Sequence, residues 1–284
     1  MAAFTAEHRT FLRELFQDRV RFDRRERKLY SHDVAAMPDL IKPFLGKTLA
    51  DAVVQPETEG ELVQLVKWAR SEGVALTPRG KATSGYGGVI PVRGGVVVDF
   101  YRLRDIVQID SANLTVTVQP GISWQALDRE LLKAGLTLRL YPTSYPASTV
   151  GGWLAQGGAG IGSYEYGYFR ENVVAARVVL PNGEVREFQG AELELIADAG
   201  GITGLISEIT LRVQRYAPLE VMAVACPDAR SLQQLVTALI SQELPIWSLL
   251  YINPRMAALK NRAPARRHDE HAPEIGRASC RERV

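Results

Sequence analysis

Two long glycine-rich segments constrain this 284-residue chain more than any other feature. The first, PRGKATSGYGG, covers residues 78–88, and the second, PTSYPASTVGGWLAQGGAGIGSYEYG, covers residues 142–167. Glycine lets backbone N–H groups approach a ligand with no Cβ in the way, and it tolerates positive φ. Successive amides in such loops form concavities that bind anions. The two segments therefore predict a ligand that carries phosphate groups.

Hydroxyl and basic side chains accompany these glycines. Arg79 and Lys81 add positive charge to the first segment. The hydroxyl donors are Thr83, Ser84, Ser148 and Thr149. A pyrophosphate needs several convergent donors because both of its phosphates are charged. The composition therefore favours a pyrophosphate-bearing ligand, and the residues alone leave open the alternative of two ordinary loops.

The usual nucleotide-binding motifs do not explain the glycines. No GxGxxG stands between a predicted strand and helix with an acidic residue about twenty positions later, as a Rossmann site requires. The P-loop pattern GxxxxGK[ST] does not occur either. A phosphate-bearing ligand would therefore be held by another architecture.

Histidine and cysteine are too few, and too far from these segments, to build a metal site or a catalytic triad. The histidines are His8, His32, His268 and His271, and the cysteines are Cys226 and Cys280. Zinc sites and serine-type triads depend on such ligands in close array. We therefore expect no metal.

Charge and hydropathy exclude further partners. The chain has 34 basic and 32 acidic residues, so its net charge of +2 creates no field for nucleic acid. The mixed-charge run at residues 19–28 reads as solvated surface. Residues 1–22 have no continuous apolar core of a signal peptide, and the uncharged residues 140–164 hold too much Gly and Pro for a membrane helix. We expect a soluble, cytoplasmic protein without a membrane span.

Short strands and capped helices alternate along most of the chain. The pattern predicts strands over 52–56, 74–78, 94–100 and 204–213, helices over 58–72 and 123–134, and hairpins over 106–120 and 173–188, the last turning at 181–183. Residues 4–20 predict an amphipathic helix capped by Thr5, and Thr58 with Glu61 has the spacing of a capping box. The fold class is therefore α+β.

The pattern restarts after Arg215. Residues 219–227, 228–242 and 247–252 predict a strand, a helix and a strand, too little to bury a sheet of their own. Residues 274–284, EIGRASCRERV, read as translated sequencing adapter, so we expect that the natural sequence was cut short. The expected organisation is an N-terminal helical segment over 1–45, a main domain over 46–217, the truncated start of a substrate or cap domain over 218–273, and adapter over 274–284.

Three motifs in order resemble one protein family. PRGKATSGYGG is followed by the segment from PTSYP to PNGEV at 142–185 and then by ADAGGITGLISEITLRV at 197–213. This order is similar to that of FAD-binding domains in the vanillyl-alcohol oxidase / p-cresol methylhydroxylase (PCMH) superfamily. Within it, the motifs resemble the FAD-linked oxidase group, which includes the FAD-linked subunit of glycolate oxidase, D-lactate dehydrogenase, D-2-hydroxyglutarate dehydrogenase and alkyl-dihydroxyacetonephosphate synthase. The resemblance covers residues 53–213.

The resemblance implies a PCMH-type fold of two α+β subdomains with FAD between them. It implies that residues 78–85 wrap the pyrophosphate and that residues 143–149, with Gly151 and Gly152, line the flavin and ribityl region. It also implies that residues 157–161 continue this wall and that residues 201–206 contact the adenine side or the ribose through backbone atoms. The cofactor-binding residues it implies are Pro78, Arg79, Gly80, Lys81, Ala82, Thr83, Ser84, Gly85, Pro142, Thr143, Ser148, Thr149, Gly151, Gly152, Gly157, Gly158, Gly160, Ile161, Gly201, Ile202, Gly204 and Ile206.

Two departures from the group bear on how the coenzyme is held. Lys81 and Ala82 stand where relatives often have small residues such as glycine, so Lys81 either adds charge near the phosphates or points to solvent. Some relatives attach the flavin through a histidine of this loop, which here has none, and Cys226 lies outside the motifs. The resemblance therefore implies non-covalent FAD.

For activity, the resemblance implies an FAD-dependent oxidoreductase that oxidises a 2-hydroxy acid by hydride transfer to flavin N5. In relatives the base comes largely from the region after the FAD domain. No catalytic residue is therefore assigned, and little turnover is expected from this chain alone. An iron–sulfur centre or a quinone would accept the electrons. Two alternatives stay open: another flavoenzyme, such as an enolpyruvyl reductase or the flavin subunit of a molybdenum hydroxylase, and a binding module without chemistry.

The aromatic residues of the second segment have two readings. Tyr164, Tyr166 and Tyr168 either approach the flavin or pack as loop aromatics, and packing is favoured. Trp153 follows a pair of glycines and reads as core.

Two further polar residues are also ambiguous. Arg170 either orients a substrate carboxylate or forms an ion pair with Glu165 or Glu171. His32 either faces the entry to the flavin or is exposed or structural, and the second reading is favoured because a lone histidine seldom acts alone.

Overall fold

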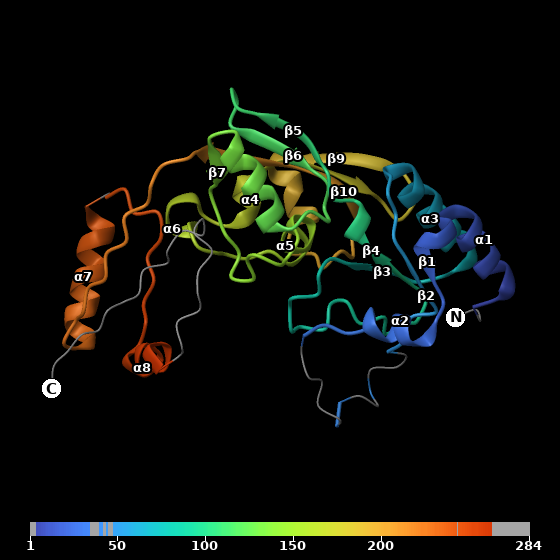
Figure 1. The fold of residues 1–284 in the computed structure, drawn as a ribbon, viewed down its shortest axis with the longest axis horizontal. Helices are drawn as coiled ribbons and strands as arrows, with labels where there is room; N and C mark the ends of the chain where they lie inside the picture. The colour runs from blue at the N-terminus through green and yellow to red at the C-terminus, as the bar shows by residue number, and fades with distance from the viewer. Residues whose placement is uncertain (1–3, 35–39, 42–43, 45–47, 243, 263–284) are drawn as a thin grey trace. The chain divides into compact units, whose positions relative to one another are not determined.

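The computed structural model describes residues 4–34, 40–41, 44, 48–242 and 244–262. It divides the chain into two compact units, Met1–Arg215 (unit 1) and Tyr216–Val284 (unit 2), shown in Figure 1. Both glycine-rich segments belong to unit 1.

Unit 1 contains a first sheet of four strands in the order β1-β2-β4-β3. These strands are β1 (Val20–Arg21), β2 (Ala52–Val54), β3 (Leu76–Arg79) and β4 (Val96–Asp99). Strands β2 and β3 run parallel to β4, and β1 is antiparallel to β2. All residues of β2 and β4 are buried, as expected of parallel strands covered on both faces.

Helices α1 (Ala6–Phe16) and α3 (Glu59–Glu72) pack on this sheet, and α2 (Arg24–Leu29) follows β1. Leu12 and Phe16 are fully buried in the same cluster as Val98, so the N-terminal helix shares the core of the sheet that follows it. The caps predicted for Thr5 and for Thr58 are confirmed, because each hydroxyl accepts a hydrogen bond from an amide of the first turn.

The predicted capping box of α3 is incomplete. The hydroxyl of Thr58 accepts from the N–H of Glu61 at 3.2 Å, but the short hydrogen bonds of the Glu61 carboxylate go to groups other than the Thr58 amide. It accepts from the N–H of Glu57 at 2.8 Å and from the guanidinium of Arg19 at 2.6 and 2.8 Å. A charged partner gives the carboxylate a stronger hydrogen bond than an amide does.

The second sheet of unit 1 has six strands in the order β5-β6-β10-β8-β9, with β7 also paired to β10. They are β5 (Ile106–Asp110), β6 (Thr115–Val118), β7 (Leu136–Leu138), β8 (Val173–Val179), β9 (Val185–Gln189) and β10 (Leu205–Arg215). All pairs are antiparallel, and both predicted hairpins are confirmed as β5–β6 and β8–β9.

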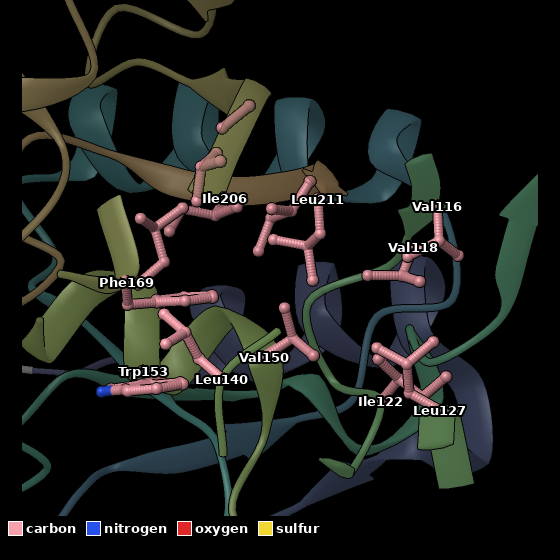
Figure 2. Packing of buried hydrophobic residues seen from close by; sticks show 14 of the residues in the cluster. Val116, Val118, Ile122, Leu127, Leu140, Val150, Trp153, Phe169, Ile206 and Leu211 are labelled. Carbon is pink, nitrogen blue, oxygen red and sulfur yellow. The ribbon is translucent and has the colours of Figure 1, made fainter. Parts of the chain in front are cut away.

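Helices α4 (Trp124–Lys133) and α5 (Val150–Gln156) lie against one face of this second sheet (Figure 1). Their buried side chains meet Ile206 and Leu211 of β10 in one core, which Figure 2 shows from close by. The rings of Trp153 and Phe169 stack there at 4.3 Å, with Trp124 edge-on to both. The core position predicted for Trp153 is confirmed.

Shorter helical turns connect these elements. They are η1 (Gln17–Arg19), η3 (Phe100–Arg102), α6 (Ser163–Tyr166), η4 (Phe169–Asn172) and η5 (Gly190–Leu195).

Glu59 at the start of α3 ties the two sheets together. Its carboxylate accepts from the guanidinium of Arg177 on β8 at 2.7 and 3.1 Å and from the hydroxyl of buried Ser207 on β10 at 2.6 Å. The Arg177 hydrogen bonds lower the pKa of Glu59. The relative position of the two sheets is therefore fixed by a polar contact as well as by apolar packing.

Unit 2 contains α7 (Ala229–Ser241), which confirms the predicted helix over 228–242, and α8 (Pro254–Arg262). The strands predicted over 219–227 and 247–252 are wrong, because those residues form no strand in the structure. Two short strands without a further sheet to join are marginal in water. Residues 274–284 lie outside the described residues. Among the residues described, no helix is both long and apolar enough to cross a membrane.

Candidate functional site

The three glycine-containing motifs meet next to the carboxyl end of β3. Gly80 lies so close to Thr149 that a Cβ at residue 80 would overlap the Thr149 hydroxyl. A Cβ on Gly201 would lie 2.6 Å from Cγ of Pro78. Near the tip of the first segment, the amide of Gln156 donates to Oγ of Ser84 at 3.1 Å. Residues of all three motifs therefore form one continuous surface.

The first segment presents a run of available amides. Within the described part of the chain, the N–H groups of residues 81–85 donate no hydrogen bond to the protein. The next two amides are engaged, because Tyr86 donates to Oγ of Ser84 at 3.3 Å and Gly87 donates to Oδ2 of Asp33 at 2.6 Å. Ala82 has φ 51°. Successive amides in such a turn are the donors that a pyrophosphate takes.

The helix α5 within the second segment uses its glycines differently. Thr149 is buried and caps α5 by accepting from the N–H of Gly152 at 3.2 Å. The N–H of Gly151 donates to the carbonyl of Pro120 at 2.9 Å, and a Cβ at 151 would overlap the Pro120 side chain. Both amides already have protein acceptors, so these glycines serve close packing beside the site.

The next glycines hold the chain against Tyr141. Tyr141 and Ile161 exchange two backbone hydrogen bonds, at 2.9 and 2.8 Å, and a Cβ on Gly160 would overlap the Tyr141 carbonyl. Gly158 is different, because it has φ 105° and, apart from its chain neighbours, no atom of the described residues lies within 4 Å of the position of a Cβ. Open space beside such a backbone is what a ligand needs in order to approach closely.

The third motif folds over the end of α5. The N–H of Gly200 donates to the carbonyl of Ala155 at 2.7 Å, and a Cβ on Gly157 would overlap the Asp198 carboxylate. Ile202 is 87% exposed, whereas Ile206 is buried in the core on β10. Of these two isoleucines, only Ile202 therefore has a side chain that a ligand can reach.

The two cations of the first segment have protein partners. Nη1 of Arg79 donates to the carbonyls of Tyr30 at 3.2 Å and His32 at 2.7 Å. Burial lowers the pKa of Arg79. Nζ of Lys81 lies 4.5 Å from the centre of the Tyr101 ring, a cation–π contact at an exposed position. Arg79 thus anchors the loop, and Lys81 remains near it.

Sequence reasoning missed an acid below this loop. Asp99 on β4 is the strand-register partner of Arg79 on β3. It is buried, and its carboxylate accepts from the side-chain amide of Gln55 at 2.7 Å and from the N–H of Tyr101 at 3.3 Å. Burial raises the pKa of Asp99. The signal in the sequence was a single acid at the end of an apolar strand, GGVVVDF.

A second missed acid fixes the start of the glycine-rich second segment. Asp128 of α4 is buried and accepts from the hydroxyls of Tyr141 at 2.9 Å and Tyr145 at 3.3 Å. Burial raises the pKa of Asp128, and burial beside that carboxyl raises the pKa of Tyr145 to about 12. The network holds residues 141–145 against the helix.

The remaining candidates pack on the core, are exposed, or pair with other residues. The hydroxyl of Tyr166 donates to Gln214 at 2.6 Å, and its ring packs on the core, as expected for a loop aromatic. Tyr164 and Tyr168 are exposed. Of the two readings of Arg170, the ion pair with Glu165 or Glu171 is wrong, because Arg170 lies 3.5 Å from Glu194, and Glu171 instead accepts from the Tyr168 amide.

The last candidate is His32. The imidazole of His32 is exposed, and its Nδ1 lies 2.9 Å from the carbonyl of Asp33. The described residues contain no group of three or more His, Cys, Asp and Glu side chains that could hold a metal ion.

Comparisons with known proteins agree with this surface. Residues 50–189 match the family model described as "FAD binding domain". The chain is 34% identical over 185 residues to the mitochondrial D-lactate dehydrogenase [cytochrome] of Arabidopsis thaliana, covering 62% of this chain and 32% of that protein. It is 30% identical over 196 residues to glycolate oxidase subunit GlcD of Bacillus subtilis, covering 66% and 40%.

A solved structure of alkyldihydroxyacetonephosphate synthase superposes with a TM-score of 0.67 at 28% identity, over 74% of this chain and 41% of that one. The chain thus spans about two fifths or less of the length of these proteins. The residues present fit FAD, because the amides of 81–85 and the open side of Gly158 remain available to a ligand. Residues 50–189 of this chain therefore carry an FAD binding domain with a PCMH-type fold, and FAD is its cofactor.

Proposed function

We propose that this chain is the FAD-binding part of an FAD-dependent oxidoreductase that oxidises a 2-hydroxy acid. The observation that carries the cofactor site is the run of available amides at 81–85, held between Arg79 and Gly87. The names of relatives support the substrate class, since they include D-lactate dehydrogenase, D-2-hydroxyglutarate dehydrogenase and a glycolate oxidase subunit.

The residues of unit 1 would each contribute to holding the coenzyme. The amides of 81–85 would donate to the pyrophosphate, and Lys81 would add a positive charge beside it. Thr149 would keep the first and second segments in register through its contact with Gly80. Gly158 would leave room for a close approach by the ligand. When bound, FAD supplies the acceptor for the substrate hydride.

We infer that the FAD is held without a covalent bond. The first segment contains no His, and Cys226 belongs to unit 2. The test is to denature the flavin-loaded protein and separate it from small molecules. The expected result is colourless polypeptide with all flavin in the filtrate, and colour retained on the chain would contradict it.

The function is tested by supplying FAD to the purified chain and recording its absorbance under anaerobic conditions. One equivalent of bound flavin is the expected result for the cofactor site. Bleaching by D-lactate, glycolate or D-2-hydroxyglutarate, or by one of them when the chain is part of a longer protein, supports the substrate class. Bleaching by NADPH alone favours an enolpyruvyl reductase-like enzyme, and a chain that takes up no FAD refutes the proposal.

A second candidate comes from the structural neighbour. Alkyldihydroxyacetonephosphate synthases are similar to this chain in both sequence and structure, so formation of an alkyldihydroxyacetonephosphate is an alternative activity. An enzyme of that kind would leave its flavin oxidised with all three hydroxy acids.

For the oxidoreductase, we propose an iron–sulfur centre or a quinone as electron acceptor. We also propose a cytoplasmic location, and cell fractionation with an antibody can check that location.

A further inference from the structure

We propose that residues 30–33 form a strap that fixes the shape of the coenzyme loop, with Asp33 as its positioning residue. The inference rests on the proposed binding of FAD at residues 81–85. The strap lies outside residues 50–189, the part matched by the FAD binding domain family. The proposal therefore gives residues 30–33, which lie outside the matched domain, a role in coenzyme binding.

The strap contacts the loop on both sides of the available amides. Before them, Nη1 of Arg79 donates to the carbonyls of Tyr30 and His32 at 3.2 and 2.7 Å, and the guanidinium lies 5.5 Å from the centre of the Tyr30 ring. After them, the N–H of Gly87 donates to Oδ2 of Asp33 at 2.6 Å. The carboxylate is buried, with only 7% of Asp33 exposed.

The strap is itself anchored, so it can impose a position on the loop. The hydroxyl of buried Ser31 donates to the carbonyl of Arg27 at 2.6 Å and accepts from the N–H of Ala50 at 3.1 Å. The guanidinium of Arg27 donates to the carbonyl of Ala50 at 2.7 Å. These contacts connect the strap to the residues just before β2, a buried strand of the first sheet.

The Asp33 carboxylate has two opposing effects on the proposed pyrophosphate site. Its negative charge would repel the coenzyme, whereas its hydrogen bond to Gly87 closes the end of the loop. If the loop reaches its binding geometry for only a fraction of the time, the apparent dissociation constant rises by the inverse of that fraction. Removing the acceptor at Asp33 therefore weakens FAD binding without removing any FAD contact.

The chain contains a matched control at the opposite end of the same sheet. There the N–H of Gly95, just before β4, donates to Oδ2 of Asp51 at 2.8 Å. As at Asp33 and Gly87, a carboxylate accepts a hydrogen bond from the backbone of a glycine. This pair lies at the start of β2 and β4, away from the loop at the carboxyl end of β3. Asp51→Ala removes the same kind of hydrogen bond without a contact to residues 81–87. It also keeps the neighbouring anchor of the strap, because Ser31 and Arg27 bind only backbone atoms of Ala50.

The experiment compares wild type, Asp33→Ala, Asp33→Asn and Asp51→Ala in the full 284-residue chain. FAD affinity is measured by fluorescence quenching, and hydrogen exchange is measured without FAD on peptides that cover residues 80–92. For Asp33→Ala we expect about 10- to 100-fold weaker binding and faster exchange at Gly87, since a charge-assisted hydrogen bond is lost. Asp33→Asn keeps an acceptor, so it should restore both values to within about 3-fold of wild type. Asp51→Ala should leave FAD affinity within about 2-fold.

The outcomes separate this inference from the proposed function. If wild type binds FAD and Asp33→Ala binds it equally well, or if Asp51→Ala loses as much affinity, the strap has no positioning role. If wild type takes up no FAD, the proposed function fails. The strap is then decided by exchange alone, and unchanged exchange at residues 80–92 in Asp33→Ala overturns it.

Discussion

The contact between Gly80 and Thr149 joins the first two motifs, and a double-mutant cycle can measure it. In Gly80→Ala the new methyl group would overlap Oγ1 of Thr149, whose cap on α5 depends on that same oxygen. Gly80 is not among the residues with positive φ, so alanine fits its backbone and the cost is purely steric. The cycle consists of Gly80→Ala, Thr149→Ala and the two together.

The structure sets the magnitudes. If Thr149 turns its hydroxyl away from the new methyl, α5 loses its N-cap, which costs about 1 kcal/mol. If it stays, overpacking costs about 1–3 kcal/mol. Thr149→Ala alone costs about 1 kcal/mol through the lost cap. In the double variant the nearest Thr149 atom that remains is Cβ at 3.6 Å, an ordinary contact, so Gly80→Ala adds almost nothing. The expected coupling free energy is therefore about 1–3 kcal/mol.

Urea unfolding followed by tryptophan fluorescence is the assay. Trp68, Trp124 and Trp153 lie in unit 1, and a Trp247→Phe background removes the signal of unit 2. This restriction matters because a chain of two units need not unfold in one step. If the two single substitutions add within about 0.5 kcal/mol, the loops are not in the contact described, and the reasoning fails.

Two further predictions concern pH. Burial raises the folded-state pKa of Asp128 above its unfolded value of 3.8, so the native state binds more protons and the free energy of unfolding falls as pH rises through that window. Asp128→Asn should flatten this slope in urea titrations at successive pH values, and an unchanged slope would contradict it. The pKa of Glu59 is lowered by Arg177, so its contribution is present above 4.5 and lost as pH falls through the folded-state value. Glu59→Gln should therefore cost about 1–3 kcal/mol at pH 7 and progressively less in acid, which the same titrations test.

Local patterns were sufficient to predict most of unit 1. The hairpins over 106–120 and 173–188 were visible because period-two alternation and a turn at 181–183 specify strand pairing between neighbours in sequence. The helix over 58–72 was visible from its cap and its apolar face. The predictions of strands over 219–227 and 247–252 are wrong for one shared reason. Their apolar residues indicate a tendency to pair, whereas a strand forms only where a partner strand is present.

The segments that form the candidate site could be predicted from the sequence, but the role of each residue within them could not. Glycine content marked the correct loops, but it could not separate Gly158, which stands beside open space, from Gly151, which packs against Pro120. Nor could it show that Arg79 is held by the carbonyls of residues almost fifty positions earlier. Roles of this kind depend on contacts between distant parts of the chain, which a single sequence without periodicity does not encode locally.

Ala82 shows how such distant contacts shape the loop. Its φ of 51° lies in the left-handed region, which costs a non-glycine residue about 1–2 kcal/mol. The resemblance predicts a small residue such as glycine at this position, but nothing local indicates that alanine adopts a conformation suited to glycine. A strained backbone persists only where its surroundings determine it more strongly than its own preference. Here the surroundings are Arg79, held by the strap three residues before, and Gly87, held by Asp33 five residues after. Residues 30–33 therefore contribute to the shape of the loop together with Thr149 and Gln156, which contact Gly80 and Ser84. A family model that begins at residue 50 can identify the loop without including the part of its support that lies at residues 30–33.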